Sequence, residues 1–242
     1  MQKFGLIGKK LGHSFSKKYF TEKFEREHIE AIYELYELQS AEQVIDLIKE
    51  EPQLKGLNVT IPYKLDVMPL LHRIDDKAKA IGAVNVIKIS HGKLTGYNSD
   101  YYGFRDSLLT WLGNSVNNIE ALILGTGGAA KAVKKALLDM NIPFRTVSSS
   151  GNGDYAYADF NGELLQKYKL IINTTPLGMF PDNDTAPDLP YHLMDETFYL
   201  YDLVYNPVTT LFMKKGSENG AKAKNGMEML ELQALKSWEI WN

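Results

Sequence analysis

Short apolar runs bounded by glycine, proline or polar residues alternate along the chain with longer segments whose apolar residues recur at helical spacing. The short runs predict buried strands and the longer segments predict amphipathic helices. Because helices separate most of the strands, this order indicates parallel sheets and an α/β protein. The predicted strands are 3–7, 32–38, 57–61, 84–89, 94–97, 121–124, 143–147, 170–173 and 198–204; the predicted helices run through residues 19–28, 41–50, 104–112 and 128–140, begin at 209–211, and follow 227.

The segment 119–140 carries the clearest pattern. Its apolar run is followed by Gly125, Gly127 and Ala130 in the spacing G-x-G-x-x-A, and then by an amphipathic helical pattern. In the dinucleotide fingerprint, the first glycine permits a tight turn, the second lets the backbone approach a pyrophosphate, and the third small residue allows close packing of helix on strand. The start of the helix then attracts phosphate. The alternative is a plain strand-to-helix turn, which glycines also favour.

The end of the next strand bears on the choice of cofactor. An NAD-binding unit places an acid there for the ribose 2′-hydroxyl, whereas this chain has Ser148, Ser149 and Ser150. Because an acid would repel a 2′-phosphate, its absence favours NADP over NAD. No arginine occupies this tip, so hydroxyl and backbone N–H groups would bind the phosphate with less charge assistance than a guanidinium gives. NAD therefore stays possible.

A polar face accompanies the apolar pattern of residues 57–64. Asn58 and Thr60 alternate with apolar residues, and Lys64 follows in the loop. Polar groups at the carboxyl end of a parallel strand lie where open α/β sheets bind ligands. The alternative is an edge strand with a solvated face and a surface lysine.

Two serines and one aspartate are further candidates. In an extended segment, Ser14 and Ser16 would direct their hydroxyls to one side and could hold hydroxyl or carboxylate groups, although Ser16 could instead cap the following helix. We interpret His13 as a loop histidine. Asp100 occupies a helix N-cap position, and it is also the kind of partner that Lys64 would need for proton transfer. Sequence spacing leaves open whether these two residues meet.

Length, charge and cysteine content narrow the class of protein. A chain of 242 residues corresponds to one or two domains, and a formal net charge of -3 gives no basic footprint for nucleic acid. The absence of cysteine excludes disulfides, thiolate nucleophiles and cysteine-ligated zinc, and no other metal-ligand cluster is evident. No apolar run has the length of a signal peptide or a membrane span. We expect a cytoplasmic protein without nucleic-acid or membrane partners.

Several stretches, taken in order, resemble the shikimate dehydrogenase family over nearly the whole chain. They are GHSFSK (12–17), NVTIPYK (58–64), GAVN (82–85), GYNSD (96–100), the glycine turn at Gly125, NTTPLGM (173–179), YDLVYNP (201–207) and NGMEMLELQA (225–234). The resemblance implies an N-terminal open α/β substrate-binding domain, 1–105 with 226–242. It also implies a Rossmann-like NADP-binding domain, 106–225, inserted into it, with a cleft between the two.

The resemblance further implies reversible NADPH-dependent reduction of 3-dehydroshikimate to shikimate, a step of aromatic amino acid biosynthesis, by a monomer or homodimer that uses no metal. Lys64 and Asp100 would be the catalytic pair. The implied substrate ligands are Ser14, Ser16, Asn58, Thr60, Asn85, Tyr205 and Gln233. The implied cofactor-binding residues are Gly125, Thr126, Gly127, Gly128, Ala129, Ser148, Ser149, Asn173, Thr174, Leu203 and Gly226.

Two departures from the family pattern stand out. Residues 148–150 are serines where the family commonly has Asn-Arg-Thr, and residues 151–169 are short and Gly/Tyr/Asp-rich where a full helix is usual, which predicts a trimmed cofactor domain. Two alternatives remain: an NAD-using quinate/shikimate dehydrogenase, and a non-catalytic dinucleotide-binding module. The second is disfavoured because a binding module needs neither Lys64 nor Asp100 as a proton-transfer pair.

Overall fold

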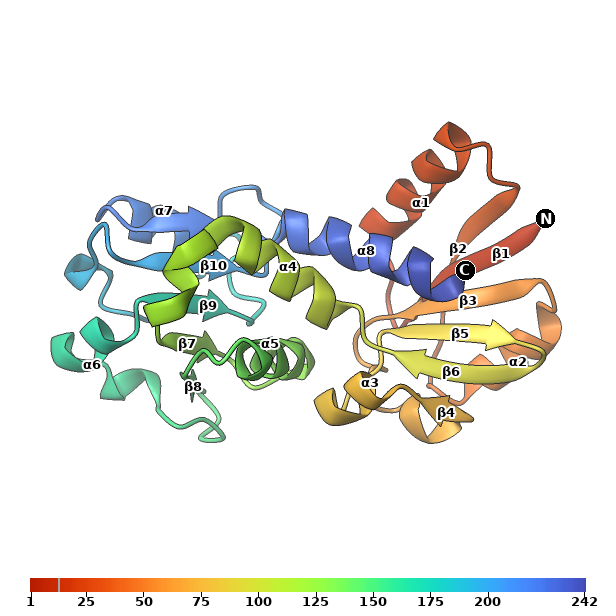
Figure 1. The fold of residues 1–242 in the computed structure, drawn as a ribbon, viewed down its shortest axis with the longest axis horizontal. Helices are drawn as coiled ribbons and strands as arrows, with labels where there is room; N and C mark the ends of the chain where they lie inside the picture. Colours follow the sequence, from red (N-terminus) through yellow and green to blue (C-terminus); the bar gives the residue numbers. More distant parts are fainter. Residues whose placement is uncertain (13) are drawn as a thin grey trace. The chain divides into compact units, whose positions relative to one another are not determined.

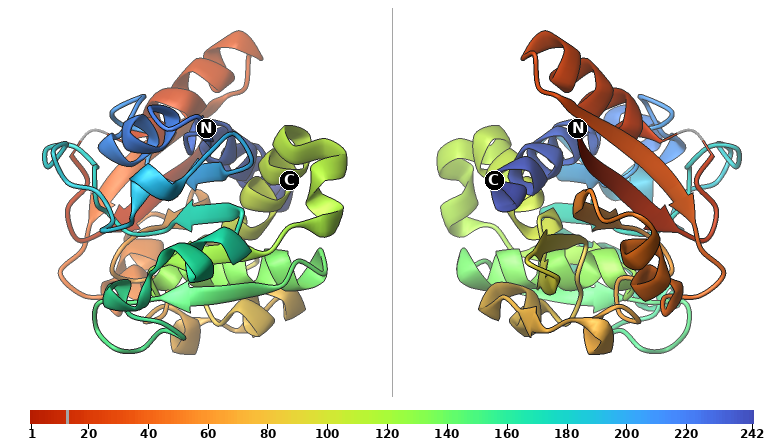
Figure 2. Two further views of the ribbon diagram at one scale, coloured as in Figure 1. Left: turned by 90° about the vertical axis from the view of Figure 1, so that its left-hand side faces the viewer. Right: turned by 90° about the vertical axis from the view of Figure 1, so that its right-hand side faces the viewer.

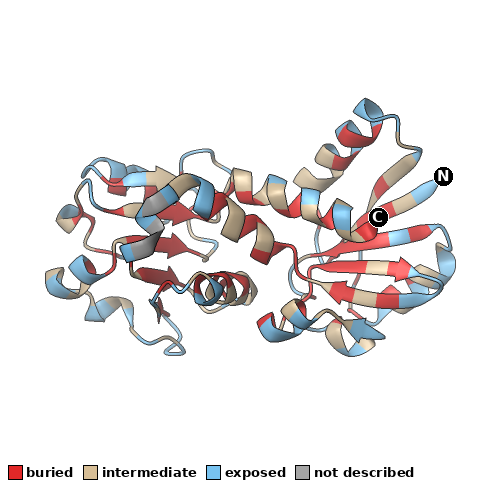
Figure 3. Ribbon diagram, viewed as in Figure 1, coloured by how far each residue is buried: buried red, intermediate tan, exposed pale blue. Residues whose placement is uncertain are grey.

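The computed structural model describes residues 1–12 and 14–242, with residues 114, 116 and 117 described in the backbone only. Our interpretation of His13 therefore concerns a residue outside the described part. The chain forms two compact units, the first comprising 1–100 with 233–242 and the second comprising 101–232 (Figure 1). In both units the buried residues concentrate on the strands (Figure 3).

The first unit contains a six-stranded mixed sheet in the order β2-β1-β3-β5-β6-β4. Strands β1, β2 and β3 are parallel, whereas β5 runs antiparallel to both β3 and β6. Its strands are β1 (Gln2–Gly8), β2 (Ala31–Glu37), β3 (Leu54–Val59), β4 (Arg73–Ile74), β5 (Val86–Ser90) and β6 (Lys93–Tyr97); its helices are α1 (Phe15–Arg26), α2 (Gln43–Glu50), η1 (Met68–Leu70) and α3 (Asp76–Ile81).

Two apolar clusters cover the faces of this sheet. One contains residues of α2 and α3, such as Val44 and Ala78, against β3 and β5. The other is aromatic and joins Phe4 of β1, Phe20 of α1 and Trp241. The right-hand view of Figure 2 shows β1 and β2 side by side with α1 beside them. The last turns of α8 (Met227–Trp241) thus complete the core of the N-terminal unit.

The second unit contains a five-stranded, entirely parallel sheet in the order β11-β10-β9-β7-β8. Its strands are β7 (Ala121–Leu124), β8 (Phe144–Val147), β9 (Leu170–Asn173), β10 (Tyr199–Asp202) and β11 (Lys222–Lys224). Its helices are α4 (Asp100–Leu112), η2 (Gly113–Asn118), α5 (Gly128–Asp139), η3 (Tyr157–Asp159), α6 (Gly162–Lys167), η4 (Tyr191–Leu193) and α7 (Leu211–Ser217). From β7 the chain adds β8 on one side and later β9 on the other, so a ligand crevice is expected at the carboxyl ends of these strands.

The α/β class and the two-part organisation predicted from sequence are confirmed, and most predicted strands and helices form. One local expectation was wrong, and two of the alternatives left open do not hold. The strand through Asn58 ends at Val59, so Thr60 lies beyond it, and the first helix begins at Phe15, so Ser14 and Ser16 do not share an extended segment. Asp100 is the first residue of α4 rather than a residue preceding it. In the described ranges, no helix combines the length and the apolar composition that a membrane span requires.

Candidate functional site

Lys64 and Asp100 form an ion pair in the first unit. The distance between Lys64 Nζ and Asp100 Oδ2 is 2.6 Å, although the residues are 36 apart in sequence. Their side chains are 19% and 13% exposed, so solvent or a small molecule can reach them. The backbone holds one partner in place, because Val84 N–H donates to the Lys64 carbonyl at 2.8 Å. A partly buried amine and carboxylate in contact can take up and return a proton.

Asn58 lies beneath this region, in a buried hydrogen-bond network. Its Oδ1 accepts from the Tyr33 hydroxyl at 2.8 Å, and its Nδ2 donates to Ser237 Oγ at 2.9 Å. Burial raises the pKa of Tyr33, and its hydrogen bond with Ser16 opposes that rise. We expected Asn58 on an open polar face; instead helices α1 and α8 cover that face, and Asn58 is buried.

Asn85 and Gln233 belong to the same network. The Ser99 N–H donates to Asn85 Oδ1 at 2.7 Å, and Asn85 Nδ2 donates to Ser99 Oγ at 3.0 Å. Ser99 Oγ also lies 3.3 Å from Gln233 Oε1 and 3.1 Å from Ser237 Oγ. Because Ser99 directly precedes Asp100, the network fixes the backbone from which that carboxylate projects.

The remaining candidates of the first unit lie at the ends of elements. Ser14 is the N-cap of α1, its Oγ accepting from Lys17 N–H at 3.3 Å, so Ser14 rather than Ser16 caps the helix. Ser16 lies in the first turn of that helix. Thr60 follows β3, and its N–H donates to the Ile7 carbonyl at 3.0 Å.

A pocket of about 560 Å³ opens at the carboxyl ends of β7, β8 and β9 in the second unit. The residues that directly follow these strands, Gly125, Ser148 and Thr174, all line it. Among the described residues that line it there is one carboxylate, Asp188, and no lysine or arginine. The other lining residues include Thr126, Gly127, Ser149, Ser150, Tyr157, Thr175 and Pro176.

The glycine turn leaves room for a ligand. Gly125 has a φ of 104°, which favours glycine, and a Cβ there would lie 2.9 Å from Thr174 Oγ1. At Gly127 and Gly128 an added Cβ would meet nothing within 4 Å, so both backbones face open space. Gly127 is the N-cap of α5 and provides no side-chain cap, and Ala129 follows in the first turn. This arrangement fits a pyrophosphate group at the helix start.

A buried carboxylate supports the wall of this pocket. Asp202 accepts hydrogen bonds from Asn173 Nδ2 at 3.0 Å and from the Thr210 hydroxyl at 2.6 Å. Asn173 Oδ1 in turn accepts from the N–H and the hydroxyl of Thr175, at 3.0 and 2.6 Å. Burial raises the pKa of Asp202 to about 6, and its hydrogen bonds oppose this rise. Asn173 is itself fully buried, so it positions Thr175 rather than facing the pocket.

Three further candidates lie near the end of β10. Leu203 N–H donates to the Asn173 carbonyl at 3.0 Å, and Leu203 is half-buried. Gly226 packs on Leu203 so closely that a Cβ would come within 2.2 Å of the Leu203 carbonyl oxygen. Tyr205 is half-buried in the second unit, and burial raises its pKa.

Sequence reasoning did not single out Tyr33, Ser99 and Ser237 in the network, or Tyr157 and Asp188 in the pocket. The position of Ser237 could have been predicted, because it lies four residues after Gln233 and therefore on the same face of the helix. Asp188 lies in a loop segment far from the strand ends in sequence, and no local pattern indicates its place in the pocket.

Comparison with known proteins places this geometry in context. Residues 6–87 match the family model described as the shikimate dehydrogenase substrate binding domain. The chain is 42% identical to a shikimate dehydrogenase (NADP(+)) of Clostridium beijerinckii, with 100% of the chain and 92% of that protein covered.

Solved structures agree with this. A chorismate mutase/shikimate 5-dehydrogenase fusion protein from Clostridium acetobutylicum is 38% identical, with a TM-score of 0.86 over 100% of this chain and 91% of that one. The shikimate 5-dehydrogenase of Thermus thermophilus, in complex with NADP(H) and shikimate, is 27% identical, with a TM-score of 0.85 over 100% and 94% of the two chains. The chain therefore belongs to the shikimate dehydrogenase family.

Proposed function

We propose that this protein is an NADP-dependent shikimate dehydrogenase, which reduces 3-dehydroshikimate to shikimate reversibly. The observation that carries the proposal is the ion pair of Lys64 and Asp100, at 2.6 Å and partly exposed, in the unit that the substrate-domain model matches. The proposal includes a substrate-binding part, 1–105 with 226–242, and a dinucleotide-binding part, 106–225. It also includes action in the cytoplasm as a monomer or homodimer.

In the direction of oxidation, a ring hydroxyl of shikimate loses a proton while its carbon loses a hydride. Lys64 Nζ takes up the proton when it is in its neutral amine form, with Asp100 orienting it, and in reduction the resulting ammonium returns the proton to the carbonyl oxygen. The nicotinamide ring, when bound, accepts or supplies the hydride. Positioning an already paired amine and carboxylate removes the need to assemble them during the reaction.

Hydrogen-bond counting assigns complementary roles to the two buried amides. Asn85 Nδ2 donates one hydrogen to Ser99, which leaves its second hydrogen for a substrate oxygen. Asn58 Oδ1 accepts from Tyr33 and retains a second lone pair, so it can accept from a substrate hydroxyl. Ser14, Ser16, Thr60, Tyr205 and Gln233 are the other proposed substrate ligands.

The pocket of the second unit is the proposed cofactor site. The open backbones of Gly127 and Gly128 at the start of α5 would hold the pyrophosphate, with Thr126 and Ala129 beside them. Ser148 and Ser149 would receive the adenosine end, and Thr174 would line the wall beside Gly125. Asn173, acting through Thr175, which it positions, completes the proposed set with Leu203 and Gly226.

The pocket lining also favours a second candidate, an NAD-using quinate/shikimate dehydrogenase, because no lysine or arginine among the described lining residues is available for a 2′-phosphate. Steady-state turnover with shikimate and NADP+, compared with quinate and NAD+, separates the two. We expect the first pair to react faster. Faster turnover of the second pair would overturn the proposal, and absence of turnover with both would favour a non-catalytic binding module.

A further inference from the structure

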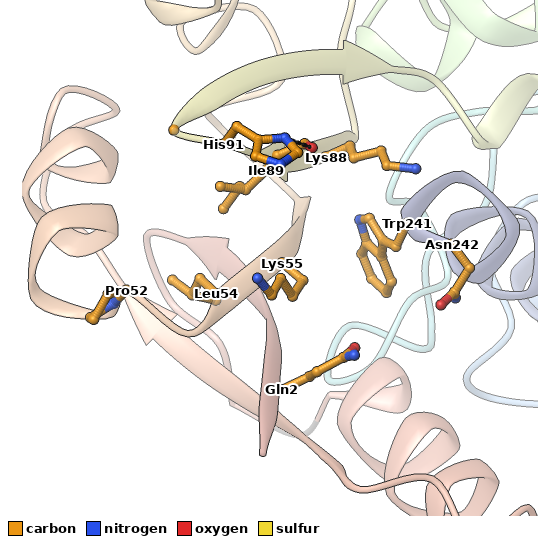
Figure 4. Close-up of a pocket in the computed structure, with 11 residues that line it drawn as sticks. Gln2, Pro52, Leu54, Lys55, Lys88, Ile89, His91, Trp241 and Asn242 are labelled. Atoms are coloured by element: carbon orange, nitrogen blue, oxygen red, sulfur yellow. Dashed lines mark hydrogen bonds between the residues drawn. The ribbon is translucent and has the colours of Figure 1, made fainter.

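A second pocket, of about 570 Å³, lies in the first unit at the amino ends of the parallel strands β1 and β3 (Figure 4). It forms where β1 and β3 begin, at Gln2 and Leu54, and where β5 ends, at Ser90. Lys64 and Asp100 instead follow the carboxyl end of β3 and the end of β6. The pocket is therefore separate from the catalytic pair, and its role is independent of the proposed function.

An irregularity in β3 brings a lysine to this pocket. Lys3 of β1 pairs with Leu54 and Phe4 pairs with Gly56, so Lys55 is an extra residue, as in a β-bulge. Leu54 and Leu57 pack in the same apolar cluster although an odd spacing would put them on opposite faces of a regular strand. Because Lys55 is an extra residue, Leu54 and Leu57 can lie on the same face of the sheet. Lys55 then lies beside Gly56, on the side opposite that cluster.

Lys88 supplies a second amine from the neighbouring strand. It pairs directly with Gly56 across the antiparallel β3·β5 ladder, so the two residues share one face of the sheet. Trp241 packs on that face, so close that a Cβ at Gly56 would lie 2.2 Å from its ring. The indole is held there by a 3.1 Å hydrogen bond from its Nε1 to the Ile87 carbonyl.

The side-chain charges around this pocket are one-sided. Lys55, Lys88 and His91 line it, and no aspartate or glutamate side chain does so among the described residues. Neither lysine forms an ion pair within the described part of the chain, and the nearby Glu51 is already paired with Lys3 at 2.6 Å. Apolar groups of Trp241, Ile89 and Pro52 complete the wall.

We propose that this pocket binds a small organic anion, with its oxyanion group held by the amines of Lys55 and Lys88 and a flat apolar body against Trp241. Two amines without carboxylate partners attract an oxyanion, and the low polarity beside the indole strengthens that attraction. The apolar body adds affinity by displacing water from the wall.

Calorimetric titration of the 242-residue chain tests the proposal, with no tag at either end because Gln2 and Asn242 line the pocket. The probes are phenyl phosphate and benzoate, with neutral benzamide and inorganic phosphate as comparisons. We expect at least one organic anion to bind, more tightly than inorganic phosphate, with affinity that falls as salt rises, and benzamide not to bind. The tighter of the two anions identifies the preferred oxyanion as phosphate or carboxylate.

The variant Lys55→Met/Lys88→Met keeps the apolar stems and removes both charges. We expect it to weaken binding at least about tenfold, with an unchanged urea midpoint, whereas Lys79→Met on α3, outside the pocket, should bind as the wild type does. Lack of binding of both anions to the wild type at about 10 mM, unchanged binding by the double variant, or equal affinity for inorganic phosphate would overturn the proposal.

Discussion

Lys64 is the side chain on which the proposed chemistry depends most directly. Replacing it with alanine removes the amine that contacts Asp100 at 2.6 Å and leaves the two amides proposed to bind substrate in place. We expect kcat to fall by roughly 10²- to 10⁴-fold while the KM for shikimate changes far less. Steady-state kinetics measures both, with Lys93→Ala, an exposed lysine on β6, as the matched control. Unchanged turnover in Lys64→Ala would remove this residue from catalysis.

Ser149 is exposed in the lining of the proposed cofactor pocket, where the described lining residues include no lysine or arginine. The substitution Ser149→Arg adds a guanidinium that can bond a 2′-phosphate. We expect the ratio of kcat/KM for NADP+ to that for NAD+ to rise by about tenfold, since a charge-assisted hydrogen bond is worth about 1.5–3 kcal/mol before side-chain ordering. Ser217→Arg, at the exposed end of α7, carries the same charge and should leave the ratio unchanged. An unchanged ratio in Ser149→Arg would place the phosphate elsewhere.

At the scale of elements, Asp202 joins the ends of β9 and β10 to Thr210, the N-cap of α7. Burial raises its pKa from 3.8 to about 6, so the folded protein binds this proton more tightly than the unfolded chain does. The stability that the neutral form contributes is present below pH 4 and is lost as pH rises toward 6. The loss of this contribution lowers the free energy of unfolding by about 1–3 kcal/mol between pH 4 and pH 6.

Asp202→Asn carries no titrating group, so it should remove this pH dependence. We expect the variant to be destabilised relative to the wild type by more at pH 4.5 than at pH 7, because only the wild type loses stability between them. Urea unfolding at both pH values measures the difference. Parallel pH profiles of the two proteins would contradict the assignment of the raised pKa to Asp202.

Helix α8 contributes Ser237 to the buried network around Asn58. Ser237→Ala leaves Asn58 Nδ2 without its 2.9 Å partner, which should lower the free energy of unfolding by about 1–3 kcal/mol. Because only the Tyr33 hydroxyl and the more distant Asn85 carbonyl, at 3.4 Å, then orient the Asn58 amide, we expect the KM for shikimate to rise more than kcat falls. Ser90→Ala, an exposed serine of the same sheet, is the control. A Ser237→Ala protein with wild-type stability and KM would show that the network does not position Asn58.

The sequence predicted elements well where the pattern is local. The turn at Gly125 lies between an apolar strand and an amphipathic helix, and both form as expected. The burial of Asn58 could not be predicted in the same way. An alternating pattern assigns residues to the two faces of a strand, but it does not indicate which elements cover each face. The face of Asn58 is covered by α1 and by a helix about 180 residues later, and no local signal carries that information. The bulge at Lys55 is equally invisible in the sequence, because only the partner strand reveals the extra residue.

At the scale of the whole molecule, the N-terminal unit depends on the last residues of the chain. Trp241 stacks on Phe4 with ring centroids 4.9 Å apart and donates to the Ile87 carbonyl. Trp241→Ala should therefore lower the free energy of unfolding by about 3–5 kcal/mol. Glu239→Ala, exposed on the same helix, should change it by less than about 1 kcal/mol. Denaturant unfolding measures both, and equal stabilities would mean that α8 is not part of this core.

The division of the chain has a consequence for its synthesis on the ribosome. Residues 101–232 form one uninterrupted unit, whereas the first unit begins at residue 1 and ends at residue 242. Asn58 meets Ser237 only after 179 further residues have been made. The usual order, in which the N-terminal part folds first, is thereby reversed. The later-made segment can reach its native state on the nascent chain, whereas the earlier-made one keeps its aromatic face uncovered until residues 233–242 have been made.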